Sequence, residues 1–439
     1  EPLPFVNIQV FPSMQGGTTN EKGKLNLNLP SGQITVRSSF IGYEDVEKQF
    51  MMNRDIKLDL VLETSGETLE TITVTDRDER EIIERPEMGV EQLNMSQIKS
   101  IPLILGELDV LKGLQLRSGV NSAGEASNGI SIRGGTIDQN LTLYDGAPVF
   151  TPTHLFGLFS VFTPDAVGSV NLYRANVPAR YGGRIASVID VRSRSPNTES
   201  FRMQGGIGLV SSHIAVETPL TSDGKLSVLA AGRVGLNDFL FDLVERLKNT
   251  ESRFADATLK FRYLASENSI FTASGFFSSD YYQVDLINTF ANINSTVNRY
   301  RYKTLNGSLE WLKLINDKTD WRSRIISSNY RPELLFPEEG SDVEVSFTSR
   351  LRQLSLQSEL SHQRGNHFLS GGIQADRYYV EPGELIPNGS TTVNSLELPV
   401  ENGLELAVFV EDRWQATEKL TFSAGLRYSH FRQLGPAEE

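Results

Sequence analysis

Hydrophobic and polar residues alternate with a period of two over much of the chain. Leu259, Phe261 and Tyr263, for example, are separated by single charged residues, and similar segments recur through residues 200–439. Successive side chains of a strand point to opposite faces of the sheet. The pattern therefore predicts a series of antiparallel strands with one apolar and one polar face.

The connections between these predicted strands are short and long in turn. Tight turns are expected near 222–224, 266–268, 316–318, 364–366 and 416–418, and long polar loops near 236–255, 281–298, 331–343 and 380–402. Transmembrane β-barrels have short turns at one end and long loops at the other, and their strands need about 9–11 residues to cross the hydrocarbon. The pattern favours about eleven barrel strands, although alternation alone would also fit a soluble sandwich or propeller.

Aromatic residues cluster at the ends of several predicted strands. The set comprises Tyr281, Tyr282, Tyr300, Tyr302, Tyr378, Tyr379 and Trp414. Barrels carry aromatic girdles where the hydrocarbon meets the headgroups. We therefore expect these side chains to face the membrane interface.

The first part of the chain predicts a small β domain and a linker. Val6, Ile8 and Val10 alternate with polar residues, as expected for a half-buried antiparallel sheet over residues 1–63. The pattern supports five or six strands, fewer than the roughly seven of a sandwich, so the first strand is expected to be missing. Residues 64–90 are polar and predict an extended linker.

Residues 91–195 show a mixed pattern. Ile104, Leu108 and Leu111 fall at helical spacing. Short strands are predicted at 130–133, 141–144, 167–173 and 187–192, separated by glycine and proline. The segment is therefore expected to form a compact α/β module.

Composition narrows the function classes. The chain of 439 residues has no cysteine, so disulfides and thiolate sites are excluded, and no segment approaches the ~20 apolar residues of a membrane-spanning helix. The net charge of -13, without a concentrated basic face, argues against nucleic-acid binding. The five histidines lack ligand spacing, and neither a nucleophile elbow nor a phosphate loop occurs. We expect no enzymatic activity, no metal and no cofactor.

Closely spaced motifs fill residues 124–194. They are SIRGG at 131–135, DQNL at 138–141, YDGAPV at 144–149, HLFGLFSVF at 154–162 and PARYGGR at 178–184. In order and spacing they resemble the plug domain of TonB-dependent outer-membrane transporters, in the version common among Bacteroidota. Residues 1–63 resemble the carboxypeptidase-regulatory-like domain of such transporters, and the peptide 70–75 resembles a TonB box.

The resemblance implies a fold and a set of functional residues. Family barrels have about 22 strands, of which residues 200–439 would supply half, so the sequence is expected to be a fragment. The coupling peptide, to which TonB would add a strand, is Thr71, Ile72, Thr73, Val74 and Thr75. Ligand contacts are expected at the plug apices, from Thr136, Ile137, Asp138, Gln139, Thr151, Thr153 and His154. A structural role is expected for His154 before a metal-binding one.

A further group of residues is expected to maintain the plug structure. It comprises Arg133, Gly134, Gly135, Asp145, Gly146, Arg180, Tyr181, Gly182, Gly183 and Arg184. The two glycine pairs suit positive φ or close backbone approach. From the resemblance, Arg133 and Arg184 are expected to form buried salt bridges with the barrel wall.

The function implied is energy-coupled import across the outer membrane, with residues 1–90 in the periplasm. The partners would be TonB, outer-membrane lipid and a scarce ligand of the siderophore, glycan, peptide or cobalamin class. A surface lipoprotein is allowed as a further partner. The alternative is a transport-inactive scaffold in an outer-membrane assembly or secretion complex.

Overall fold

The computed structural model contains two compact units, Glu1–Arg85 and Pro86–Glu439, which are described separately. The structure describes the whole chain except residues 1–2, 4–5, 12–14, 21, 30–31, 40–45, 55, 63–89, 95–97, 99–106, 123–128, 237, 239–240, 242–249, 285–287, 291–292, 296, 338–342, 391–392, 418–419 and 437–439. The predicted linker 64–90 therefore lies almost entirely outside the described residues.

The first unit is built on a four-stranded antiparallel sheet in the order β2-β1-β3-β4. Its strands are β1 (Asn7–Phe11), β2 (Gln15–Thr18), β3 (Gly32–Ser39) and β4 (Val46–Met52). Val6, Ile8 and Val10 form its core with two residues of β3. Residues 56–62 form no strand, although they alternate, but their leucines pack against this core. The alternation thus predicted correctly which side chains face the core, but it predicted a strand that does not form.

The second unit contains an inner module, defined as the described residues from 90 to 195. Its five-stranded sheet has the order β5-β12-β13-β8-β9, with β8 and β13 parallel and the other pairs antiparallel. The strands are β5 (Val90–Asn94), β8 (Asn140–Tyr144), β9 (Ala147–Pro148), β12 (Val167–Tyr173) and β13 (Ser187–Ser193). Two small hairpins pair β6 (Val120–Ser122) with β7 (Ile130–Ile132), and β10 (Thr153–His154) with β11 (Phe159–Ser160).

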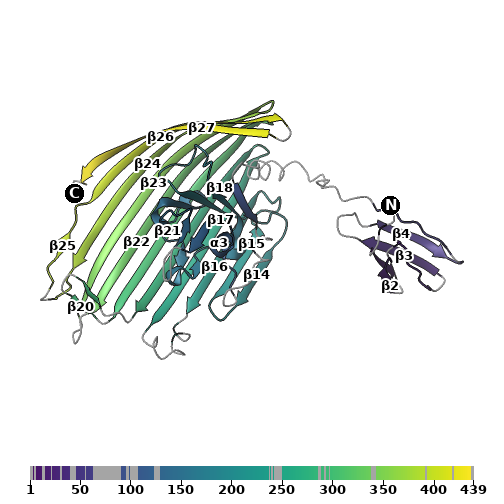
Figure 1. The fold of residues 1–439 in the computed structure, drawn as a ribbon, viewed down its shortest axis with the longest axis horizontal. Helices are drawn as coiled ribbons and strands as arrows, with labels where there is room; N and C mark the ends of the chain where they lie inside the picture. The colour runs from purple at the N-terminus through teal and green to yellow at the C-terminus, as the bar shows by residue number, and fades with distance from the viewer. Residues whose placement is uncertain are drawn as a thin grey trace. The chain divides into compact units, whose positions relative to one another are not determined.

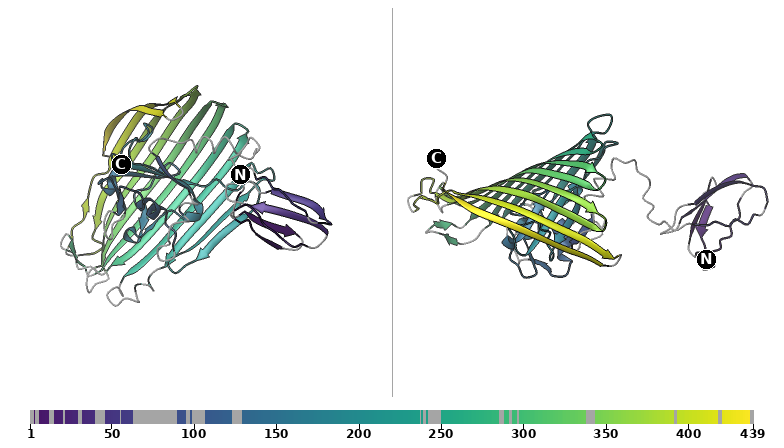
Figure 2. Two further views of the ribbon diagram at one scale, coloured as in Figure 1. Left: turned by 45° about the vertical axis from the view of Figure 1, so that its right-hand side comes forward. Right: turned by 90° about the horizontal axis from the view of Figure 1, so that it is seen from above.

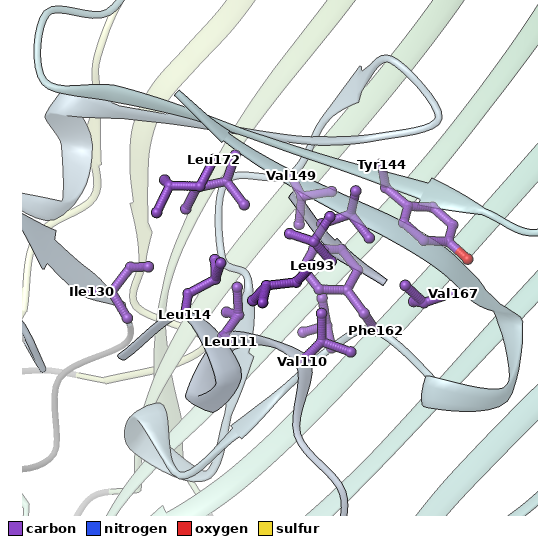
Figure 3. Packing of buried hydrophobic residues seen from close by; sticks show 14 of the residues in the cluster. Leu93, Val110, Leu111, Leu114, Ile130, Tyr144, Val149, Phe162, Val167 and Leu172 are labelled. Carbon is purple, nitrogen blue, oxygen red and sulfur yellow. The ribbon is translucent and has the colours of Figure 1, made fainter. Parts of the chain in front are cut away.

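Helix α3 (Val110–Gln115) packs into the core of the inner module, and three 3-10 turns complete it. These are η1 (Ile137–Gln139), η2 (Leu155–Gly157) and η3 (Pro164–Ala166). Asp109 caps α3 by accepting a hydrogen bond of 2.7 Å from the Lys112 N–H. Leu111 and Leu114 of the helix are buried in one cluster with Leu172 (Figure 3). The short helix therefore owes its stability to this packing more than to its length.

Most of the remaining strands form one large antiparallel sheet. The short strand β25 (Leu396–Glu397) also belongs to it, but pairs only with β24 and lies outside the continuous strand order. The strands in the continuous order are β14 (Arg202–Ile207), β15 (Ser212–Pro219), β16 (Leu226–Leu236), β17 (Glu251–Ser266), β18 (Ser269–Val284), β21 (Asn298–Asn316), β22 (Thr319–Pro337), β23 (Glu344–Arg364), β24 (His367–Ile386), β26 (Glu401–Thr417) and β27 (Leu420–Pro436). A separate hairpin pairs β19 (Asn288–Phe290) with β20 (Ile293–Ser295). Figures 1 and 2 show neighbouring strands in chain order and the inner module against one face of the curved sheet.

The two ends of this sheet differ as predicted. Connections 237–250, 285–297, 338–343 and 387–400 lie at one end, here called the long-loop end. Connections 267–268, 317–318, 365–366 and 418–419 lie at the other, the short-turn end. The fold is mainly β with a large antiparallel barrel-type sheet, as the sequence predicted.

The strands are longer than predicted. From β17 to β24 they have 16–21 residues, against the 9–11 expected. The apolar stretch of the outer face, which faces away from the inner module, covers only part of each strand. In β21, exposed Leu305 and Leu309 occupy the middle, whereas Lys303 continues the same face toward the long-loop end. The strands therefore extend well past the length that hydrophobicity alone predicts.

The aromatic prediction was half right. Tyr281 and Tyr379 lie on the outer face, in register with other outward residues. Tyr282, by contrast, is buried on the inner face, where its hydroxyl bonds Asp280. Adjacent strand residues point to opposite faces, so a Tyr-Tyr pair cannot belong wholly to one girdle.

No helix within the described residues is long and apolar enough to cross a membrane.

We predict that Leu114→Ala destabilises the inner module by about 2–5 kcal/mol, because the fully buried side chain would leave a cavity. Hydrogen exchange of β12 and β13 in the full-length protein measures the effect. Leu116→Ala is the matched control, since Leu116 caps the same helix and is 67% exposed. Equal exchange in the two variants would contradict the assigned core.

Candidate functional site between the inner module and the sheet

His154 of the inner module lies fully buried between two aspartates of the sheet. Its Nδ1 is 2.6 Å from Asp280 Oδ1, and its Nε2 is 2.8 Å from both carboxylate oxygens of Asp256. Arg233 of β16 donates to Asp256 Oδ2 from Nε at 3.0 Å and from Nη2 at 2.7 Å. The imidazole also stacks on Phe254, with ring centroids 4.3 Å apart. We call His154, Asp256, Asp280 and Arg233 the buried charge network.

The buried charge network is neutral only when His154 is protonated. Two carboxylates then balance one guanidinium and one imidazolium, and both ring nitrogens donate to carboxylates. Burial lowers the pKa of His154, but Asp256 and Asp280 raise it further, to about 9. His154 is therefore a cation at neutral pH. The two carboxylates lie on opposite edges of the ring and leave no shared point for a metal ion.

The same network holds the backbone of the β10–β11 hairpin. Arg233 Nη2 donates to the Ser160 carbonyl at 2.5 Å. The Tyr282 hydroxyl donates to Asp280 at 2.6 Å and accepts a hydrogen bond from the Leu155 N–H. Residues 154–160 are thus bound to β16, β17 and β18 by charged or aromatic side chains of the sheet.

A second polar contact lies around β13. Asp190 Oδ2 accepts hydrogen bonds from Arg192 at 2.9 Å and from the Tyr181 hydroxyl at 3.1 Å. Burial raises the pKa of Asp190, but Arg192 lowers it more, so the group remains ionised. On the facing wall, Glu310 pairs with Arg324 and lies 3.7 Å from Arg322. A cavity of 160 Å³ is lined by Tyr181, Asp190 and Arg192 of the module and by Arg322 and Arg324 of the wall.

Other contacts tie the module to later strands. Tyr144 packs against Phe276, with ring centroids 4.9 Å apart, and its hydroxyl lies 3.0 Å from Thr258 Oγ1. At the far side of the sheet, the Ala179 N–H donates to Glu411 Oε2 at 2.8 Å. The inner module is therefore held by polar and ionic bonds at several strands, together with apolar clusters that contain residues of both the module and the sheet.

The two groups of proposed apical residues lie in different surroundings. Thr136 and Asp138 are exposed around η1, and Ile137 and Gln139 are half-buried there. Thr151, Thr153 and His154 are buried, with Thr151 donating to the Tyr330 hydroxyl at 2.8 Å. Ligand contact by either group stays a prediction. The coupling peptide 71–75 lies outside the described residues.

Each glycine pair combines the two expected uses of glycine. Gly134 and Gly183 have φ of 79° and 77°, which side chains disfavour. A Cβ on Gly135 would lie 2.5 Å from Ala186 Cβ, and one on Gly182 would lie 2.5 Å from Arg427 Nε of β27. The second approach brings the backbone of the module directly against the wall.

The turn at Asp145 and Gly146 also has positive φ, of 46° and 84°. The Asp145 carboxylate accepts from Ser193 N at 3.0 Å and from Ser193 Oγ at 2.5 Å, while Lys260 of β17 lies 3.8 Å away. Asp145 therefore stabilises both its own turn and the contact with the sheet.

The expectation of buried salt bridges from Arg133 and Arg184 was wrong. Both side chains are exposed, and neither forms an ion pair with any residue that the structure describes. Arg133 has φ of 52°, and Arg184 follows Gly183 at positive φ and lines a cavity that Tyr378 and Glu405 of the wall also line. Arg180 instead stacks over the Tyr181 ring, 4.9 Å from its centroid.

The sequence did not reveal Asp256, Asp280 and Arg233 as partners of His154. These three residues lie 79–126 positions after His154 in the sequence, although their side chains meet in the structure. In the sequence, each of them is only a charged residue on the polar face of a predicted strand. Barrels have such residues at many positions, so the pattern does not single these three out.

Three family models match the chain. One describes a CarboxypepD_reg-like domain over residues 1–74, one a TonB-dependent receptor plug domain over 89–188, and one a TonB-dependent receptor-like β-barrel over 232–437. The chain belongs to the TonB-dependent receptors. The inner module is accordingly the plug, and the large sheet is barrel wall. The limits 1–63, 91–195 and 200–439 predicted for the domains stay predictions.

Solved structures with a similar fold include siderophore receptors. The ferric enterobactin receptor PfeA of Pseudomonas aeruginosa is 17% identical, with a TM-score of 0.57 over 82% of this chain and 59% of that chain. The siderophore receptor PirA of Acinetobacter baumannii is 14% identical, with a TM-score of 0.58 over 82% and 58%. FpvA of P. aeruginosa, solved with heterologous pyoverdines, is 13% identical, with a TM-score of 0.59 over 80% and 53%.

The chain thus spans between half and three fifths of the length of these structures. Such low identities show the fold and leave the ligand open. A search of curated proteins found no match to the chain.

We predict that the contact between plug and wall weakens as the pH rises through about 9. The folded-state pKa of His154 lies above its ordinary value of 6.5, so its stabilisation is complete below pH 6.5 and lost above about 9. The loss is on the order of 3 kcal/mol. Melting of the full-length protein in detergent between pH 6 and 10 measures it.

His154→Gln should melt lower at pH 7 and lose this pH dependence. His367→Gln is the control, because His367 also bonds an aspartate, Asp412 at 2.8 Å, but is 45% exposed. A pH profile of His154→Gln that parallels the unsubstituted protein would rule out the protonated network.

Proposed function

We propose that the full-length protein is an energy-coupled importer of the outer membrane, with residues 1–90 in the periplasm. A scarce ligand of the siderophore, glycan, peptide or cobalamin class binds at the apices of the plug. TonB adds a strand to the peptide 71–75 and displaces the plug. In this proposal the chain itself catalyses no reaction and needs no cofactor.

The observation that supports this function is the presence of buried ionic and polar bonds in the plug–wall contact, beside its apolar clusters. An interface that is permanently closed is stabilised best by apolar packing, because a buried ion pair costs desolvation. Here His154, Asp190 and Arg192 are ionised at or near the contact, and Ala179 is held through a carboxylate. Water can solvate each of these groups after separation, which lowers the cost of moving the plug.

The siderophore receptors with this fold make a siderophore one candidate ligand. At 13–17% identity they carry no information on which residues bind it. The exposed residues Thr136 and Asp138 stay the candidates for first contact, and those around Thr151 would require local rearrangement.

Deletion of residues 71–75 should abolish growth of a strain that depends on this transporter for a limiting nutrient, because TonB would have no strand to bind. Deletion of residues 77–81 removes the same length of linker and is the control. Normal growth after the first deletion, with the receptor present in the outer membrane, would disprove the coupling role.

A disulfide between plug and wall should also block uptake. Cysteines at Ala179 and Gly425 would have Cβ atoms 2.8 Å apart, about 1 Å below the usual disulfide value, which a small shift corrects. Since the chain has no cysteine, only the intended bond can form within it. We expect Ala179→Cys with Gly425→Cys to lose uptake when oxidised and to regain it on reduction.

The two single-cysteine variants should transport normally under both conditions. A scaffold in an assembly or secretion complex needs no plug movement. If the oxidised double variant supports growth as well as the unsubstituted protein, with the disulfide verified by mass spectrometry, the scaffold alternative is favoured.

A further inference from the structure

The outer face of the sheet has an apolar band and, beside it, an unusual group of cations. Phe261, Leu305, Leu309, Ile325, Leu354 and Leu356 are among the exposed apolar residues of the band. Lys303 of β21, Arg331 of β22 and Arg352 of β23 lie on the same face, toward the long-loop end. Lys303 and Arg352 directly follow the band, whereas two polar residues separate Arg331 from Ile325. We call these three residues the outer basic cluster.

The strand register brings the cluster together. Lys303 is directly opposite Arg331 across the β21–β22 ladder, and Arg352 is opposite Asn329, two positions from Arg331. Residues directly opposite have Cβ atoms about 4.5–5.5 Å apart, and like charges there are destabilising. All three side chains are exposed. The sheet therefore places three cations within reach of one anion.

Neighbouring arginines are neutralised, whereas the cluster is not. Arg301 pairs with Glu333 at 3.5 Å, and Arg350 pairs with Glu381 at 3.1 Å. Among the residues that the structure describes, no carboxylate forms an ion pair with Lys303, Arg331 or Arg352. Arg352 packs only on the Tyr379 ring, 5.5 Å from its centroid.

We propose that the outer basic cluster binds the phosphate of a membrane lipid whose acyl chains lie on the apolar band. A phosphate monoester carries about -1.5 to -2 charges, and the planar guanidinium of arginine matches its oxygens. The apolar band and the cations adjoin on β21 and β23, and the register places Arg331 of β22 beside Lys303, as an amphiphile with a phosphorylated headgroup requires. The inference rests on the proposed membrane location.

The test uses the full-length protein in neutral detergent with phosphatidic acid as the probe and phosphatidylcholine as the reference lipid. Native mass spectrometry counts retained lipid, and melting measures stabilisation. We expect phosphatidic acid to be retained and to raise the melting temperature. Lys303→Gln with Arg331→Gln and Arg352→Gln should weaken binding about 100-fold, at roughly one factor of five per cation.

The same triple variant should melt slightly higher than the unsubstituted protein without lipid, because the repulsion between Lys303 and Arg331 is gone. A misfolded variant would melt lower. Lys303→Arg with Arg331→Lys and Arg352→Lys keeps the charges and should keep the lipid. Lys225→Gln with Lys318→Gln and Arg364→Gln removes three exposed cations at the short-turn end and should also leave binding unchanged.

Equal retention of phosphatidic acid by the charge-removed variant would overturn the site. Inorganic phosphate that binds as tightly as phosphatidic acid would overturn the lipid as its occupant. Neither result bears on import, which the deletion of 71–75 tests independently.

Discussion

A charge buried away from water must be balanced by an opposite charge, and this constraint decides how plug and wall fit together. Asp256 and Asp280 project from adjacent strands into the interior, where their combined charge would be intolerable alone. His154 and Arg233 supply the balance from two different parts of the fold. Displacement of the plug therefore removes one of the two balancing cations, His154, and must admit water to these aspartates.

The constraint also separates the two faces of the sheet. On the inner face, several charges are paired with the plug or with one another, as in Glu310 with Arg324. On the outer face, the middle of each strand is apolar and charges begin only beyond Leu305 or Leu354. An alternating sequence thus suits the different surroundings of the two faces, because successive side chains of a strand point to opposite faces.

Local patterns revealed most of the fold. The alternation around Leu259 and the turns between strands predicted the antiparallel sheet and its two unlike ends, and the motif of residues 178–184 identified the plug. Strand length was underestimated, because polar outer-face residues such as Lys303 and Arg331 extend the ladder past the apolar signal. Whether Tyr282 faces inward or outward depends on its position in the alternation of β18. Predicting that position requires the pairing register of the strand.

The candidate site was much harder to predict than the fold. His154 was recognisable as a plug residue with a structural role, but nothing local distinguishes Asp256 or Asp280 from other polar residues of the wall. Arg133 and Arg184 were attractive as charges within motifs, yet both are exposed and form no ion pair within the part of the chain that the structure describes. Pairing across more than a hundred residues is decided by tertiary structure, whereas a motif describes only its own segment.

The pairing of Asp280 with Tyr302 in the β18–β21 ladder has a consequence for how this sequence can diverge. Insertion or deletion of a single residue within either strand would exchange the two faces from that point onward. Asp280 would then lie on the outer face, and Ser279 or Tyr281 would take its place opposite the imidazole. We infer that changes of length are confined to the connections between strands, so that the loops can diversify while the spacing within each hairpin stays fixed.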